Sequence, residues 1–323
     1  MPNHLRPCIL LLLLICSCGP SQKDKKSDRV PVIGFIDYVE DATLAKARQG
    51  FLDALRNNGY SDSAKTLEVI YRNAQGDQPT LLQTADYLIS QQPVLIATNT
   101  TLATVNTVQR NREIPVFMMV APRPDIAGLT NAAGKAPENL YGVYETLEYI
   151  DTSVALIAGL FPQAKRAGTI YSQSESQSID ALERLKAGCE KAGITLEAIP
   201  VTNSSETQLI TQTLLAKGID VFFALPDNVI FSSFETIVKA CDEQKVPIIT
   251  SEEGLVSRGA LASFGADMYQ WGYQSGEQAA QLLKTGTTEG LKPEIVKQRK
   301  RTMNRSKATT YLNTIDTTFT LIP

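Results

Sequence analysis

Short apolar runs alternate with longer amphipathic segments over most of this chain. Run 34–37 is followed by a segment in which Leu44, Phe51 and Leu55 recur at helical spacing. Apolar runs of this length are typical of parallel strands that are buried on both faces of a sheet. Strands that alternate with helices predict an α/β fold with right-handed crossovers.

The alternation occurs twice along the chain. Segments 34–60 and 168–194 are equal in length, align without a gap and reach Gly59 and Gly193 at corresponding places, where helices are expected to end. Further strand-like runs follow in step in both copies: 66–70 with 195–199, 94–98 with 221–225, and 114–118 with 246–250. The repeat predicts two doubly wound parallel-sheet lobes, which suits a chain too long for one core.

The first residues have the pattern of a secretory signal. Arg6 precedes an apolar run, 8–16, that is shorter than the roughly 20 residues of a membrane span, and a polar stretch follows it. Residues 15–18 resemble a bacterial lipobox. We therefore expect a signal peptide at 1–17, lipidation of Cys18 and a lipid-anchored linker at 18–29. The alternative is an ordinary signal peptide with incidental cysteines.

Cleavage before Cys18 changes the chemistry that the mature chain can perform. It removes His4, the one histidine of the sequence, and with it any histidine-based catalytic pair or metal ligand. Cys189 and Cys241 remain, too few for a four-cysteine zinc site, and we expect buried single thiols rather than a disulfide. No cofactor or metal is expected.

The charge balance bears on the partners. The formal net charge is −3 at pH 7, and loss of the signal peptide with its one basic residue, Arg6, makes the mature chain more negative by one charge. This argues against a nucleic-acid partner. The basic run 297–301 is expected to be a solvated strand rather than a docking patch.

The loops that follow the predicted strands carry the candidate site. Ligands of open α/β sheets lie beyond the carboxyl ends of the strands, so two facing lobes would share a cleft there. These loops are rich in Thr, Ser and acids, and several open helices whose N–H groups favour an anion or carboxylate. The candidate ligand-binding residues are Tyr38, Glu40, Thr98, Asn99, Thr100 and Arg123 in the first copy, and Tyr171, Ser174, Glu175, Ser176, Asp227, Asn228 and Glu252 in the second.

At these positions the chain resembles the bacterial ABC-transporter substrate-binding lipoproteins whose characterised members take up tryptophan, tyrosine or phenylalanine. The resemblance is collinear from about Val32 to the C-terminus. It rests on the order of short motifs, beginning with Gly34-Phe35-Ile36-Asp37-Tyr38-Val39-Glu40 and continuing at 50–55, 73–77, 127–129, 171–176, 227–228, 251–253 and 259–265.

The resemblance implies a type I periplasmic-binding-protein fold with three crossovers. Lobe 1 would comprise 30–144 and 267–292, and lobe 2 would comprise 145–266 and 293–323. The implied function is capture of a small solute, an amino acid with aromatic ones among the candidates, by hinge closure. Delivery would be to an ABC permease and its ATPase. A monomer in the cell envelope, held to a membrane by its acyl anchor and facing the periplasm or the exterior, is expected.

One departure from the family pattern concerns the ligand. Where the family usually reads Thr-Asp-Pro-Val, this chain reads Pro122-Arg123-Pro124-Asp125. We hypothesise that Arg123 holds a ligand carboxylate in a bidentate grip. The alternative is a surface arginine paired with Asp125 or a neighbouring acid.

Several residues allow two roles. Tyr38 and Tyr171 would either stack on a ligand or close their loops, and Glu175 would be either a ligand-amine partner or a helix-start acid. Trp271 is expected to pack between the lobes or in a core rather than to serve as a ligand platform. A ligand-sensing lipoprotein that feeds a separate signalling receptor is the alternative function. Glycoside hydrolysis by the cleft carboxylates Glu40, Glu175, Asp227 and Glu252 is not expected.

Overall fold

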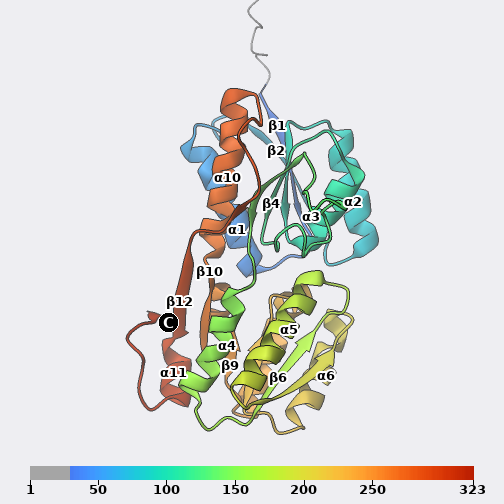
Figure 1. Ribbon diagram of the computed structural model, residues 1–323. Helices are drawn as coiled ribbons and strands as arrows, with labels where there is room; N and C mark the ends of the chain where they lie inside the picture. The colour runs from blue at the N-terminus through green and yellow to red at the C-terminus, as the bar shows by residue number, and fades with distance from the viewer. Residues whose placement is uncertain (1–29) are drawn as a thin grey trace, which may run out of the picture. The chain divides into compact units, whose positions relative to one another are not determined.

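The computed structural model describes residues 30–323, of which 31–323 form one compact unit. Two β-sheets covered by helices make up the two lobes of this unit (Figure 1). The predicted signal peptide, Cys18 and the linker lie outside the described residues. Within residues 30–323, none of the helices combines the length and the apolar character of a membrane span.

The sheet of the first lobe has six strands in the order β11-β5-β4-β3-β1-β2, and its strand pairs are parallel. Helices α1 and α10 pack on one face, and α2 and α3 pack on the other. The elements are β1 Val32–Asp37, α1 Ala42–Asn57, β2 Glu68–Asn73, α2 Gln78–Ser90, β3 Leu95–Asn99, α3 Thr101–Arg110, β4 Val116–Met119, β5 Leu140–Tyr144, α10 Met268–Thr285 and β11 Glu294–Ile295.

The sheet of the second lobe has seven strands in the order β13-β12-β10-β9-β8-β6-β7. Helix α4 packs beside α5, and α6 packs beside α8. The elements are α4 Tyr149–Leu160, β6 Arg166–Tyr171, α5 Ser176–Lys191, β7 Thr195–Pro200, a 3₁₀ turn Ser204–Glu206, α6 Thr207–Leu215, β8 Val221–Ala224, α7 Asn228–Ser232, α8 Phe234–Glu243, β9 Ile248–Thr250, α9 Glu253–Val256, β10 Ala262–Ala266, β12 Arg299–Asn304, α11 Arg305–Tyr311 and β13 Thr320–Ile322.

The predicted fold class, two doubly wound α/β lobes, is confirmed. One strand pair departs from the parallel pattern, because β12 runs antiparallel to β10, and β13, which is parallel to β12, therefore also runs opposite to the rest of the sheet. Strand β12 enters the sheet directly from the other lobe without a helical crossover, so it arrives in the opposite direction.

Three segments connect the lobes: residues 145–148 between β5 and α4, Asp267 between β10 and α10, and residues 296–298 between β11 and β12. Strand β11 pairs with β5 in the first sheet. Residues up to Ile295 therefore belong to the first lobe, whereas the expected boundary placed 293 onward in the second. A strand of two residues is too short to stand out in the sequence pattern.

Ion pairs join these connecting segments. Arg299 Nη2 donates to Glu145 Oε1 at 2.7 Å, and Arg299 Nε donates to Glu145 Oε2 at 3.0 Å. Lys300 Nζ lies 2.5 Å from Asp267 Oδ2. The basic run 297–301 has exposed residues, as expected, but it also supplies two cations at the start of β12, directly after the third segment, that pair with acids of the first two segments.

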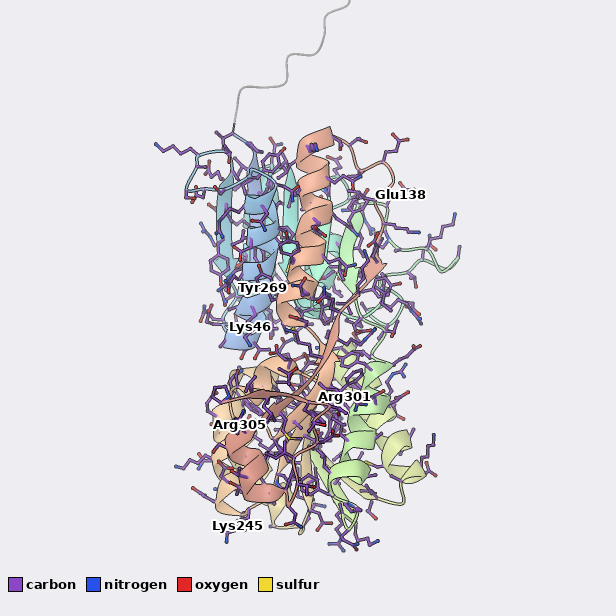
Figure 2. All side chains as sticks on the ribbon, turned by 90° about the vertical axis from the view of Figure 1, so that its left-hand side faces the viewer. Lys46, Glu138, Lys245, Tyr269, Arg301 and Arg305 are labelled. Carbon is purple, nitrogen blue, oxygen red and sulfur yellow. The ribbon has the colours of Figure 1, made fainter. Side chains whose placement is uncertain are left out.

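Helix α10 reaches the first lobe after the chain has passed through the second, and it docks side by side with α1 (Figure 2). A Cβ added at Gly272 would lie 1.8 Å from the carbonyl oxygen of Ala47, and one added at Gly50 would lie 2.0 Å from that of Tyr269. Glycine is therefore required at both positions. This contact fixes the N-terminal end of α10, which carries Trp271.

Cys189 and Cys241 are buried free thiols, as expected. Burial raises the pKa of Cys189 to about 11 and that of Cys241 to about 12. Both thiols therefore stay protonated and unreactive at neutral pH.

Candidate ligand-binding site

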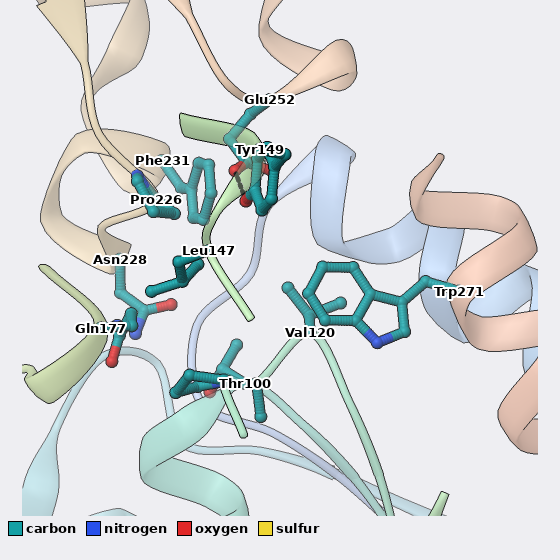
Figure 3. Close-up of a pocket in the computed structure, with 12 residues that line it drawn as sticks. Thr100, Val120, Leu147, Tyr149, Gln177, Pro226, Asn228, Phe231, Glu252 and Trp271 are labelled. Carbon is teal, nitrogen blue, oxygen red and sulfur yellow. Dashed lines mark hydrogen bonds between the residues drawn. The ribbon is translucent and has the colours of Figure 1, made fainter. Parts of the chain in front are cut away.

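A cavity of about 20 Å³ lies between the lobes, which is room for roughly one water molecule (Figure 3). Both lobes and the first connecting segment contribute to its wall. The lining residues are Thr100, Val120, Ala121, Pro122 and Trp271 from the first lobe, Leu147 and Tyr149 from the first connection and the start of α4, and Gln177, Pro226, Asn228, Phe231 and Glu252 from the second lobe.

Apolar side chains form much of the wall. Val120, Leu147, Phe231 and Trp271 lie around the space in Figure 3. The indole Nε1 of Trp271 donates a hydrogen bond of 2.8 Å to the carbonyl oxygen of Val143. Because the polar edge of the ring is already satisfied, its apolar surface is what remains to face the cavity.

Strained backbone is concentrated at this wall. Thr100, Val120 and Leu147 have φ angles of 90°, 49° and 63°. Positive φ is unfavourable for branched side chains, and Thr100, with ψ of 160°, occupies a region that is essentially reserved for glycine. Such strain costs about 1–3 kcal/mol per residue and typically marks a functional site.

Polar atoms without a protein partner also gather here. The buried atoms Thr100 Oγ1, Gln177 Oε1 and Glu252 Oε2 receive no hydrogen bond from the described residues, and all three residues line the cavity. An unsatisfied buried polar atom costs about 1–3 kcal/mol. These atoms are therefore suited to meet the polar groups of a bound solute.

Glu252 is the acid with a free oxygen at the cavity. Its side chain is buried, and Oε1 accepts hydrogen bonds from Tyr149 Oη at 2.9 Å and from Ser251 Oγ at 3.0 Å. Burial is the main cause that raises the pKa of Glu252 to about 7. Its neighbour at the wall, Tyr149, has its pKa raised well above the ordinary value by burial and by the Glu252 carboxylate.

Glu175 lies behind the wall. Its Oε2 accepts hydrogen bonds from Asn228 Nδ2 at 2.7 Å, from the Asn228 backbone N at 3.2 Å and from Gln177 Nε2. Burial, followed by the charge of Asp227, raises the pKa of Glu175 well above its ordinary value. Glu175 thus orients Gln177 and Asn228, which face the cavity.

Asp227 is fully used by the protein itself. Its Oδ1 caps α7 by accepting from the backbone N of Val229 and Ile230, and its Oδ2 accepts from Ser172 N at 2.7 Å and Ser178 Oγ at 2.6 Å. With four donors, Asp227 has no free oxygen to offer a ligand ammonium.

Most of the remaining candidates lie outside the cavity wall. Tyr38 Oη donates to the carbonyl oxygen of Gly76 at 2.7 Å, and Glu40 is exposed and accepts from Asn73 Nδ2 at 3.0 Å. Three of the others form side-chain hydrogen bonds within the protein: Thr98 with Thr104, Asn99 with Asp37, and Ser174 with Ser172. Ser176 is exposed at the start of α5, and Tyr171 is partly buried against the hydrophobic core of the second lobe.

Arg123 is paired with Asp125 at the surface. Its guanidinium forms two hydrogen bonds with Asp125, of 2.6 and 2.8 Å, and both side chains are close to half exposed. The preceding residue, Pro122, lines the cavity, but Arg123 does not. The structure therefore does not place this cation where it would hold a buried carboxylate.

Several wall residues escaped the sequence analysis: Val120, Leu147, Tyr149, Gln177 and Phe231. Trp271 was expected to pack between the lobes or in a core rather than to serve as a ligand platform, and it packs in the core of the first lobe but also lines the cavity. Gln177 directly follows the predicted loop 171–176, so a wider window would have included it. Leu147 lies in the first connection between the lobes and Tyr149 directly follows it, and no residue pattern marks that place as part of a site.

Two α/β lobes, three connections and a cavity between the lobes define a bilobed solute-binding protein with the type I periplasmic-binding-protein fold. The family model for ABC transporter substrate-binding proteins matches residues 32–317, and the chain belongs to this family. It is a family of solute-binding proteins rather than of enzymes.

The relatives include proteins that bind aromatic amino acids. The tyrosine-binding protein of Clostridioides difficile (strain R20291) is 35% identical over 266 residues, which cover 82% of this chain and 76% of that protein. The solved structure of an ABC domain in complex with L-Trp from Streptococcus pneumonia has a TM-score of 0.80 at 27% identity, and the match covers 88% of this chain and 95% of that one.

A second similar structure was solved without a ligand, unlike the L-Trp complex. It is the ligand-free, open structure of a substrate-binding protein with adhesive properties from Clostridium difficile. Its TM-score is 0.65 at 27% identity, although the match covers 91% of this chain and 99% of that one.

Proposed function

We propose that this protein captures an amino acid, preferably an aromatic one, by closing its two lobes, and delivers it to a membrane permease with its ATPase. Membership of the family supports the transport role. The tyrosine-binding relative and the L-Trp complex support the class of solute.

The observation that carries the proposal is the free oxygen of Glu252. Glu252 Oε2 is buried and has no hydrogen-bond partner among residues 30–323, and no Lys or Arg is among the residues that line the cavity. A ligand ammonium would supply both the missing donor and the missing positive charge. Gln177 Oε1, which also lacks a partner in the described part of the chain, would accept a second ammonium hydrogen.

The start of α3 is the proposed place for the ligand carboxylate. The hydroxyls of Thr100 and Thr101 are buried without a partner among the described residues, and no side chain caps this helix of 10 residues. The backbone N–H groups of a first helical turn lack intrahelical acceptors and favour negative charge. Hydroxyl and N–H donors together would hold a carboxylate without a cation.

The apolar wall is the proposed place for the side chain of the solute. Val120, Leu147, Phe231 and Trp271 would surround an aromatic ring, and aromatic pairs contribute about 0.5–1.5 kcal/mol beyond the area that they bury. Micromolar to nanomolar capture requires about 8–12 kcal/mol in all.

Closure of the lobes is the proposed mechanism. The cavity of about 20 Å³ is much smaller than an amino acid, so the lobes must separate for a solute to enter. The fold matches the L-Trp complex with a TM-score of 0.80 and the open, ligand-free structure with 0.65, at the same 27% identity. This difference supports a lobe arrangement close to the closed one.

Lipidation of Cys18 and residence outside the cytoplasm complete the proposal. The lipobox-like sequence and the polar linker motivate them. Cys18→Ser should release the protein from membranes or leave the precursor uncut. A variant that stays membrane-bound with an unchanged N-terminus would place the anchor elsewhere.

The test of the main proposal is calorimetric titration of a soluble form of the mature protein that starts after Cys18, residues 19–323, with L-tyrosine, L-tryptophan, L-phenylalanine and L-leucine. We expect at least one aromatic amino acid to bind with micromolar or tighter affinity, and to raise the melting temperature by mass action. Tyramine, which lacks the carboxylate, should bind more weakly than L-tyrosine. Absence of binding by all three aromatic amino acids would refute the proposed solute class.

A further inference from the structure

A second contact between the lobes lies away from the cavity and centres on Arg258, which follows α9 in the second lobe. Its side chain is 13% exposed. Within its own lobe, Nε and Nη2 donate to the two carboxylate oxygens of Glu235 at 2.8 Å each, and the guanidinium lies 5.5 Å from the centre of the Phe234 ring. These contacts fix the guanidinium in one orientation.

The same guanidinium reaches across to the first lobe. Arg258 Nη1 donates to Asp41 Oδ2 and lies 3.4 Å from Thr43 Oγ1. The Asp41 side chain is 1% exposed. The pair joins groups that are 217 positions apart in the chain and belong to different lobes, so it forms only when the lobes are together.

The two oxygens of Asp41 have separate roles. Oδ1 caps α1 by accepting from Thr43 N at 2.7 Å and from Leu44 N at 3.0 Å. Oδ2 accepts from Arg258. One atom therefore serves the fold of the first lobe, and the other serves the contact between the lobes.

The lobes approach very closely at this contact. A Cβ added at Gly254, in α9, would lie 2.1 Å from Cγ2 of Thr43. Neighbouring Glu253 adds a longer ion pair of 3.8 Å with Lys46 of α1. We call Asp41, Thr43, Gly254 and Arg258 the interlobe clamp.

The clamp is connected to the ligand-binding wall. Arg258 Nη2 donates a hydrogen bond of 2.8 Å to the carbonyl oxygen of Phe231, and the Phe231 side chain lines the cavity. A single guanidinium thus holds a wall residue of the second lobe and an acid of the first lobe.

We propose that Arg258 is a positioning residue for solute retention: its pair with Asp41 slows reopening of the lobes and thereby sets the rate of ligand dissociation. The inference rests on the proposed function. The pair is not yet formed when the solute first meets the open protein, so it should have little effect on the association rate. It must be broken before the lobes can reopen, so its free energy should appear mainly in the dissociation rate.

The variant that separates the two roles of Asp41 is Asp41→Asn. Asparagine is as good an N-cap as aspartate, so Oδ1 can still cap α1. The amide that replaces Oδ2 presents a donor to Arg258 in place of an acceptor. The variant should therefore fold and melt like the wild type without ligand, while the clamp is lost.

Dissociation can be followed without a label. The chain has a single tryptophan, Trp271, and it lies in the cavity wall. Stopped-flow Trp fluorescence with L-tyrosine or L-phenylalanine as the probe should show dissociation about tenfold faster in Asp41→Asn, with association changed by less than about threefold. Arg258→Gln should give a similar increase, and the double variant should add little to either single change.

Arg184→Gln is the matched control, since this arginine is 26% exposed and pairs with Asp180 and Asp151 inside the second lobe only. It should leave both rates unchanged. An unchanged dissociation rate in a normally folded Asp41→Asn protein would overturn the inference.

A ligand-independent measurement keeps the inference separate from the proposed function. Spin labels on the two lobes report the distribution of lobe separations in the protein without added solute. Asp41→Asn should shift this distribution toward larger separations, whatever solute the protein binds. Identical distributions in wild type and variant would overturn the clamp, whereas absence of binding by aromatic amino acids would refute only the proposed solute.

Discussion

Tyr149 Oη donates a hydrogen bond of 2.9 Å to Glu252 Oε1, and both side chains are buried at the wall of the cavity. Tyr149 begins the helix that follows the first connection between the lobes, and Glu252 follows β9 in the second lobe. The hydrogen bond occupies one carboxylate oxygen and leaves Oε2 to face the cavity. The connection between the lobes thus helps to fix the acid that we assign to the ligand ammonium.

Replacement of Glu252 tests this assignment. Glu252→Gln keeps the size of the side chain but removes the charge, so amino-acid binding should weaken by about 1.5–3 kcal/mol, measured by calorimetric titration. Glu197→Gln is the control, because this acid pairs with Lys217 within the second lobe and does not line the cavity, so its loss should change affinity little. Equal affinity of Glu252→Gln and wild type would exclude Glu252 as the ammonium partner.

The titration of Glu252 should also be visible in the stability of the protein without ligand. Burial raises its pKa to about 7, from an ordinary value of 4.5. A raised carboxyl pKa stabilises the fold fully below the unfolded-state pKa, and this contribution is lost as the pH rises through the folded-state pKa.

The free energy of unfolding of wild type should therefore fall, relative to that of Glu252→Gln, between about pH 4.5 and pH 7, by roughly 3 kcal/mol. Denaturant unfolding of both proteins across this range measures the difference. The comparison removes the contributions of Glu175 and Asp227, whose raised pKa values act in the same direction in both proteins. A pH-independent difference would mean that Glu252 does not titrate in this window.

Much of the architecture could be predicted because it depends on patterns that the chain repeats. Apolar runs, amphipathic segments and an internal repeat predicted two doubly wound lobes with a shared cleft. The short strand β11 was missed, since it has only two residues. The basic run 297–301 was expected to be a solvated strand, and β12 begins within it, but the antiparallel direction of β12 was not predicted.

The candidate site was predicted less well, and the acids show why. Glu175, Asp227 and Glu252 all follow strands of the second lobe and precede helices, so sequence position gives them the same expected role. Hydrogen bonding separates them: Asp227 receives four donors, Glu175 supports Asn228 and Gln177, and Glu252 keeps a free oxygen. Such a distinction arises from tertiary contacts and leaves no local signal in the sequence.

Arg123 provides a prediction of no effect. Because its guanidinium pairs with Asp125 at the surface, Arg123→Ala should change amino-acid affinity by less than about twofold, within the small contribution of an exposed ion pair. Calorimetric titration decides this point. A large loss of affinity with an unchanged melting temperature would restore Arg123 as the carboxylate ligand and would argue against the start of α3.

Thr100 provides the prediction in which stability and binding should move in opposite directions. Its φ of 90° and ψ of 160° are accessible to glycine but strained for a β-branched residue, and its buried hydroxyl has no partner within residues 30–323. Thr100→Gly should remove both the backbone strain and the unpaired hydroxyl, and so raise the free energy of unfolding by about 1 kcal/mol.

Thr100→Gly should also weaken amino-acid binding by about 0.5–1.5 kcal/mol, because one donor to the carboxylate is lost. Thr100→Ser keeps the hydroxyl and should bind nearly as tightly as wild type. If Thr100→Gly were more stable and bound equally well, the strain would have no role in binding, and the carboxylate would have to lie away from the start of α3.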